Sequence, residues 1–178
     1  MILAIDPGRH PGYVLLDETQ LVERKHFAGR PRLPLILGAW RSFESYCADR
    51  TCRSPSIPTI VVIEGQHGKL SDARRNSILT LANEAGWQLR RAVHSLEATP
   101  VIVHPQATGK SPPGWRDALR CARVAKEVVQ ARVSRSLLPS EAPFFSCHSV
   151  RRMGDLLDAV GIGWGYWILQ PKAWESPP

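Results

Sequence analysis

The chain has 178 residues, of which 43% are hydrophobic and 22% are charged. The length is that of one ordinary domain, and the composition is close to the globular average, which excludes an intrinsically disordered chain. The 23 Lys and Arg residues exceed the 16 Asp and Glu residues and give a net charge of +7. This excess favours a polyanionic partner, either nucleic acid or an anionic membrane surface.

Neither membrane insertion nor secretion is expected. The apolar runs are shorter than the roughly 20 residues of a membrane-spanning helix. The first residues, MILAIDPG, form a strand-like segment rather than the charged start and cleavage site of a signal peptide. We therefore expect a cytoplasmic protein with no membrane association.

The cysteines do not have the paired spacing of a zinc site. They are Cys47, Cys52, Cys121 and Cys147. We expect free thiols, and a Cys47–Cys52 disulfide is the alternative.

Short apolar runs separated by Gly and Pro predict strands in the first part of the chain. Residues 2–6 and 12–16 flank PGRHPG and predict a β-hairpin, which a third strand near 21–27 extends. The Pro-bearing RPRLP then leads into a helix with apolar residues between 35 and 47. The run at 59–64 is continuously apolar up to its final Glu, which is typical of a central strand buried on both faces.

Helices and strands alternate in the second part of the chain. Apolar periodicity predicts helices over 72–95, 116–138 and 149–168, with a short strand at 100–103. The Gly-, Pro- and Ser-rich segment 104–115 is expected to be a flexible loop. The predicted fold is α/β, with one domain over residues 1–170 and a flexible tail over 171–178. Its five-stranded mixed sheet joins a three-strand antiparallel meander to two parallel strands.

Four acidic residues occupy positions at which a fold can bring them together. Asp6 and Glu64 each end an apolar strand, and Asp155 and Asp158 share one face of the last helix. Like charges this close need compensation, and oxygen-only ligands favour Mg²⁺ or Mn²⁺. Two such ions can assist a phosphodiester displacement. The alternative is that each acid has an independent structural role.

These motifs resemble the RuvC-type Holliday junction resolvases. ILAIDPGRHPGYVLLD resembles the first hairpin of that family, IVVIEG its second acidic strand and GDLLDAVGIGWGYW its closing helix. SILTLANEAG at 77–86 is similar to the interface helix of the family, and the basic segment 122–138 to its lysine-bearing helix. The sequence GQHG after Glu64 departs from the family, which often has an aromatic residue there, and indicates a divergent or phage-type member.

The resemblance implies an RNase H-like fold, a homodimer, and nicking of branched DNA with two Mg²⁺ or Mn²⁺ ions per active site. By motif position, Asp6, Glu64, Asp155 and Asp158 match the catalytic, metal-binding acids, and Lys126 matches a lysine close to the active site. The protein would then resolve four-way junctions by paired symmetric nicks in recombination and repair. It would act in a bacterial nucleoid, an infected host or a DNA-containing organelle.

Basic residues gather between His104 and Arg135, where seven Lys and Arg face two acidic residues. On a continuous helix Arg116, Arg120 and Arg123 would form one stripe that can neutralise phosphates; the alternative is a solvated helix face. Trp115 is a candidate for stacking on a base. The predicted DNA-binding residues are His67, Lys69, Lys110, Trp115, Arg116, Arg120 and Arg123.

Three other functions stay open at this point. A general branched-DNA or flap nuclease would use the same chemistry without a strict four-way preference. A DNA-junction-binding relative would lack catalysis, although the complete acid set disfavours it. An actin-like ATPase also opens with I-D-x-G, but it needs two lobes, and 178 residues hold one.

Overall fold

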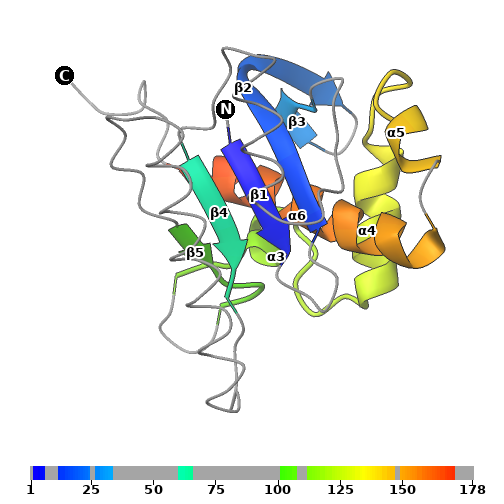
Figure 1. Cartoon of the computed structure of the whole chain (residues 1–178). Helices are drawn as coiled ribbons and strands as arrows, with labels where there is room; N and C mark the ends of the chain where they lie inside the picture. Colours follow the sequence, from blue (N-terminus) through cyan, green and yellow to red (C-terminus); the bar gives the residue numbers. More distant parts are fainter. Residues whose placement is uncertain are drawn as a thin grey trace, which may run out of the picture.

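The computed structural model describes residues 2–6, 12–24, 27–33, 60–65, 101–107, 112–146 and 149–170. Its strands form one five-stranded mixed sheet in the order β3-β2-β1-β4-β5 (Figure 1). They are β1 (Ile2–Asp6), β2 (Gly12–Arg24), β3 (Phe27–Arg32), β4 (Ile60–Glu64) and β5 (Val101–Val103). β1, β2 and β3 are antiparallel neighbours, whereas β4 is parallel to β1 and β5 is parallel to β4. The predicted meander with two added parallel strands is confirmed.

The central strand β1 is buried along its whole length. Ile2 pairs with Leu16 of β2 on one side and with Ile60 of β4 on the other. An all-apolar run suits this position because side chains on both faces of a central strand are withdrawn from water. The strand ends at Asp6, which places a carboxylate at the edge of an apolar core.

The second and third strands differ from the sequence prediction. β2 is one strand over Gly12–Arg24, and β3 begins at Phe27 and runs through Pro31, with register shifts between the two. Pro31 is tolerated because β3 lies at the edge of the sheet, where a missing N–H costs no ladder hydrogen bond. The predicted helices at 35–47 and 72–95 lie outside the described residues, as do Cys47, Cys52 and Cys147; Cys121 is a buried free thiol.

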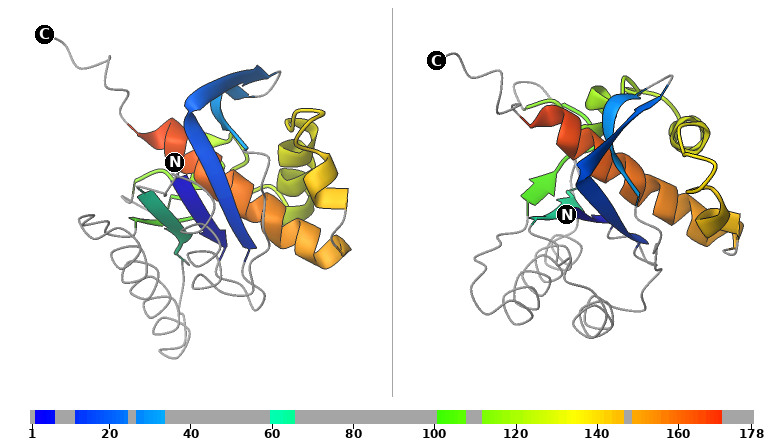
Figure 2. Two further views of the ribbon diagram at one scale, coloured as in Figure 1. Left: turned by 45° about the horizontal axis from the view of Figure 1, so that its top comes forward. Right: turned by 90° about the horizontal axis from the view of Figure 1, so that it is seen from above.

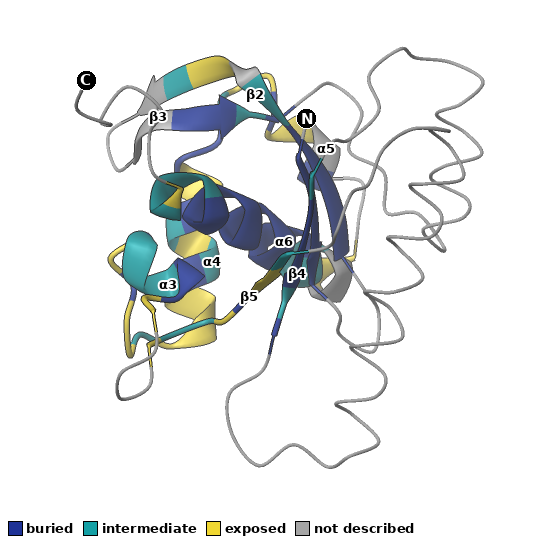
Figure 3. Ribbon diagram, turned by 90° about the vertical axis from the view of Figure 1, so that its left-hand side faces the viewer, coloured by how far each residue is buried: buried dark blue, intermediate teal, exposed yellow. Residues whose placement is uncertain are grey.

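The last helix, α6 (Val150–Leu169), crosses the sheet and contacts four of its strands (Figure 2). Its central residues are buried where they face the strands (Figure 3). Gly163 allows this close packing, because a Cβ added there would lie 2.2 Å from Leu16 Cδ1 and 3.0 Å from Ala4 Cβ. Within the described part of the chain, no helix combines the length and apolar character needed to cross a membrane.

The predicted helix over 116–138 is wrong, because two short helices replace it. α3 spans Trp115–Ala118 and α4 spans Lys126–Arg135. Leu119 and Cys121 are both buried, and residues two apart point to opposite sides of a helix. The backbone turns between α3 and α4 and takes both side chains into the core.

A buried ion pair ties β3 to the segment around α5 (Pro143–Ser146). Arg30 Nη2 lies 2.6 Å from Glu141 Oε2, and both side chains are almost fully buried. The Glu141 carboxylate also accepts hydrogen bonds from the backbone N–H groups of Leu33 and Leu138. The Arg30 guanidinium lies over the Trp164 ring of α6, at 4.3 Å from its centroid. This cluster connects β3, the chain after α4, and α6.

Candidate metal centre

Two of the predicted acids end neighbouring parallel strands. Asp6 is the last residue of β1 and Glu64 the last residue of β4, and the two strands pair in parallel from Ile2 with Ile60 to Ile5 with Ile63. Parallel neighbours end at the same edge of a sheet. Asp6 and Glu64 therefore come to the same edge of the sheet.

The helix α6 brings the other two acids to the same edge. Gly12, which pairs with Asp6, allows this approach, because a Cβ at residue 12 would lie 2.3 Å from the backbone oxygen of Asp155. Carboxylate oxygens of Asp6, Asp155 and Asp158 lie within 4.8 Å of one another. The three acids form a cluster, which we call the acid cluster, and Glu64 lies beside it.

Burial and mutual repulsion change the protonation of these acids. Burial, reinforced by the nearby charges of Glu64 and Asp158, raises the pKa of Asp6 from 3.8 to about 7. Burial also raises the pKa of Glu64 and of Asp158. Charged carboxylates in such surroundings are stable only with a compensating cation.

Two residues of α4 hold one oxygen of Asp158. Lys126 Nζ lies 2.6 Å from Asp158 Oδ2, and Gln130 Nε2 donates to the same oxygen at 3.0 Å. Burial lowers the pKa of Lys126, but its hydrogen bond to Asp158 and the charges of Asp158 and Asp6 outweigh burial and raise that pKa. The structure thus places Lys126 beside the acids, as its motif position implied. Sequence inspection missed Gln130, because a lone Gln on a helix carries no signal.

The other oxygen, Asp158 Oδ1, is buried and has no hydrogen-bond partner in the structure. A buried carboxylate oxygen without a donor is costly unless something else binds it. The acid cluster offers only oxygen ligands, which suit Mg²⁺ or Mn²⁺. The residues therefore fit a divalent cation held by Asp6, Asp155 and Asp158.

The prediction that Trp115 stacks on DNA from a flexible loop is wrong. Its side chain is 1% exposed, which leaves no ring face for a base. Its Nε1 donates to Glu64 Oε1 at 2.9 Å. The described residues near it are tied down, because Asp117 Oδ2 accepts from the N–H groups of Gly114 and Ala107.

The predicted arginine stripe does not form, since Arg116 alone lies on α3. Arg120 and Arg123 follow in the turn before α4, with positive φ angles of 54° and 57°. Both are exposed, whereas Arg116 is half-buried and its charge lowers the pKa of Glu64 and of Asp158. Arg116 therefore interacts electrostatically with the acids, while Arg120 and Arg123 face solvent. His67, Lys69 and Lys110 lie outside the described residues.

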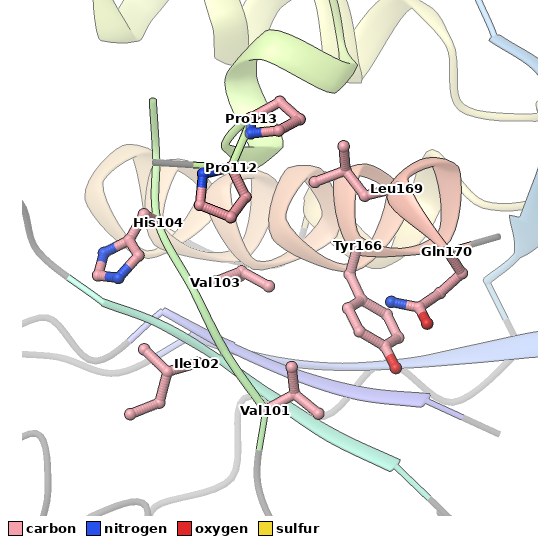
Figure 4. Close-up of a pocket in the computed structure, with 9 residues that line it drawn as sticks. All are labelled: Val101, Ile102, Val103, His104, Pro112, Pro113, Tyr166, Leu169 and Gln170. Atoms are coloured by element: carbon pink, nitrogen blue, oxygen red, sulfur yellow. The ribbon is translucent and has the colours of Figure 1, made fainter. Parts of the chain in front are cut away.

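A separate apolar pocket of about 250 Å³ lies between β5, Pro112 and Pro113, and the end of α6 (Figure 4). Its walls include Ile102, Tyr166 and Leu169, and none of the four acids lines it. Because it offers no carboxylate, this pocket is not the candidate metal centre.

The sheet order, the parallel pairing of β4 with β1 and the packing of α6 give the chain an RNase H-like fold. The chain is similar in structure to RuvC of Thermus thermophilus, with a TM-score of 0.48 and 19% identity over 94% of this chain and 93% of that one. It is also similar to the same protein in complex with a Holliday junction substrate, with a TM-score of 0.45 and 19% identity over 94% and 92% of the two chains. No family model matches the sequence, and no curated protein matches it.

Proposed function

We propose that this chain is a divalent-metal-dependent endonuclease that nicks branched DNA, with the four-way junction as its substrate. The observation that carries the proposal is the acid cluster: three carboxylates from β1 and α6 within 4.8 Å, with Glu64 of β4 beside them. The sequence motifs that resemble the RuvC-type resolvases contain these same four acids.

The chain's own residues divide the chemistry between them. Asp6, Asp155 and Asp158 would hold Mg²⁺ or Mn²⁺, with Glu64 as a further ligand. Bound cations supply a lowered pKa for an attacking water and positive charge for the leaving oxygen. The Lys126 ammonium group lies 2.6 Å from Asp158 and is half-exposed. It can therefore also interact with an incoming phosphate and stabilise the negative charge that develops there.

Exposed basic residues provide the proposed contacts to DNA phosphates. Arg120 and Arg123 project from the turn that directly precedes Lys126. Contacts of this kind bind phosphates without reading sequence, so the proposed binding is selective for DNA shape and sensitive to salt. A homodimer would present two such sites to the two-fold symmetric junction.

Cleavage of an end-labelled synthetic four-way junction tests the activity. We expect nicks with Mg²⁺ or Mn²⁺ and none with chelator. Asp158→Asn should lower the rate by at least about a hundredfold, the upper end of the loss caused by removing an outer-shell partner of a metal. Glu127→Gln is the matched control, because Glu127 is an exposed carboxylate in the first turn of α4. Wild-type cleavage by Asp158→Asn would refute the proposal.

The same assay on three-way, flap and linear DNA tests the substrate preference. The proposal expects the four-way junction to be cut at least about tenfold faster than the other substrates, which corresponds to about 1.4 kcal/mol of discrimination. Equal rates on all branched substrates would instead identify a general branched-DNA nuclease.

A further inference from the structure

Trp115 lies between the two elements that carry the acids. Its backbone N–H donates to His104 O at 2.9 Å, and that of Arg116 donates to Pro105 O at 2.9 Å. These bonds fix the start of α3 to the segment that follows β5, the strand next to β4. The position of Trp115 is therefore set by the chain that leaves β5, next to the end of β4 at Glu64.

Two glycines of α6 make room for the Trp115 side chain. A Cβ at Gly161 would lie 2.7 Å from Trp115 Cζ3, and a Cβ at Gly165 would lie 2.5 Å from Trp115 Cβ. The two glycines are one helical turn apart and so share a face. The indole is held against the helix that also carries Asp155 and Asp158.

The polar atom of this buried ring reaches an acid. Trp115 Nε1 donates to Glu64 Oε1 at 2.9 Å, and this hydrogen bond lowers the pKa of Glu64 against the effect of burial. A Glu side chain has three rotatable bonds, and a fixed donor selects one of their arrangements. The bond thus fixes the orientation of the Glu64 carboxylate, whose oxygens keep lone pairs for a cation.

We propose that Trp115 is a positioning residue, which holds Glu64 in the arrangement that a divalent cation at the acid cluster requires. The proposal rests on the proposed function, because it assigns Glu64 to the same metal centre. Outer-shell partners of metal ligands commonly contribute 10- to 100-fold to metal affinity. Trp115 would act through Glu64 and would touch neither the cation nor DNA.

A Mn²⁺ titration by calorimetry on the full metal-free chain tests this role without measuring activity. Trp115→Phe keeps an aromatic ring and removes the N–H donor. The matched control is Trp164→Phe, since Trp164 is equally buried and donates its N–H to Pro31 O at 3.2 Å, away from the acids. We expect Trp115→Phe to weaken Mn²⁺ binding about tenfold and Trp164→Phe to change it less than about twofold.

A coupled variant separates positioning from general damage. In a Glu64→Gln background, Trp115→Phe should cause no further loss of Mn²⁺ affinity, because the two residues act through one contact. Should Trp115→Phe fail to fold, the benzothienyl analogue of tryptophan at position 115 keeps the shape of the ring and removes only the donor.

Four outcomes are decisive. Wild-type Mn²⁺ affinity in Trp115→Phe would overturn the positioning role, and so would equal weakening in Trp115→Phe and Trp164→Phe. If the wild-type chain binds no Mn²⁺, or Asp158→Asn binds it as tightly as wild type, the proposed metal centre itself fails. The failure of the positioning role is thereby distinguished from the failure of the function.

Discussion

At the scale of single residues, the stability of the folded chain depends on whether Asp6 is protonated. Its pKa is raised from 3.8 to about 7 in the fold, mainly by burial. Between these two values the folded state binds more protons than the unfolded state, so stability falls as pH rises. The raised pKa values of Glu64 and Asp158 act in the same direction.

We therefore expect the metal-free chain to lose stability between pH 5 and pH 8. Asp6→Asn should flatten this dependence, whereas Glu127→Gln, with an exposed side chain, should keep it. Urea unfolding with chelator at the two pH values measures the effect. A wild-type pH dependence in Asp6→Asn would show that the raised pKa of Asp6 does not cause the loss of stability. Added Mn²⁺ should stabilise the wild type more at pH 8 than at pH 5, because ligands must be deprotonated to bind.

Arg120 offers a second test, because its backbone conformation lowers the stability of the fold whereas its charge is proposed to strengthen DNA binding. A positive φ of 54° is unfavourable for an Arg, whereas Gly adopts it without a steric cost. Arg120→Gly should raise stability by about 1 kcal/mol and weaken junction binding, with the salt slope reduced by about 1. Arg120→Ala should weaken binding equally without the gain in stability. Unchanged binding in both variants would remove Arg120 from the DNA-binding surface.

Sequence inspection succeeded for the acids and failed for Trp115, for physical reasons. Asp6 and Glu64 follow directly from where apolar runs stop, which is local information. Trp115 follows Gly and Pro, and that composition predicts a mobile loop. Its burial depends on Gly161 and Gly165, more than 40 residues further along the chain. The available signal for this burial was a Trp together with two glycines one turn apart on a distant helix. That signal can be interpreted only when the packing of the helix is known.

At the scale of elements, the same division appears between local and distant information. The strands β1 and β4 and the helix α6 were predicted because apolar pattern alone defines them. The break between α3 and α4 was missed, because left-handed turns usually use Gly, and here Arg120 and Arg123 occupy those positions. The core contacts of Leu119 and Cys121 override local preference at this break.

The ion pair between Arg30 and Glu141 predicts a large loss of stability on its disruption. Glu141→Gln would leave the Arg30 guanidinium buried without a counter-charge, and such losses cost about 3 to 5 kcal/mol. Glu127→Gln should change stability by less than about 0.5 kcal/mol, as expected for an exposed site. Urea unfolding measures both, and a loss below about 1 kcal/mol in Glu141→Gln would contradict the structural role of the pair.

At the scale of the whole molecule, an acidic centre and exposed basic residues occur in one chain of net charge +7. The charge alone predicted a polyanionic partner, and the fold adds that the charges of Arg116 and Lys126 lie close enough to Glu64 to oppose the rise in its pKa. The resemblance to the RuvC-type resolvases also implies a homodimer, and residues 77–86, which are similar to the interface helix of that family, lie outside the described part of the chain. A single copy offers one acid cluster in the part of the chain that the structure describes, so paired cleavage needs two copies.

The most direct test of the central claim is the position of the nicks on a four-way junction labelled separately on each strand. We expect two nicks at symmetric positions on opposing strands, made with Mg²⁺ or Mn²⁺ by a species of twice the 19.8 kDa chain mass. Asp6→Asn should abolish both nicks and keep junction binding. The absence of nicks with either cation, or wild-type nicking by Asp6→Asn, would contradict a metal-dependent nuclease built on these acids.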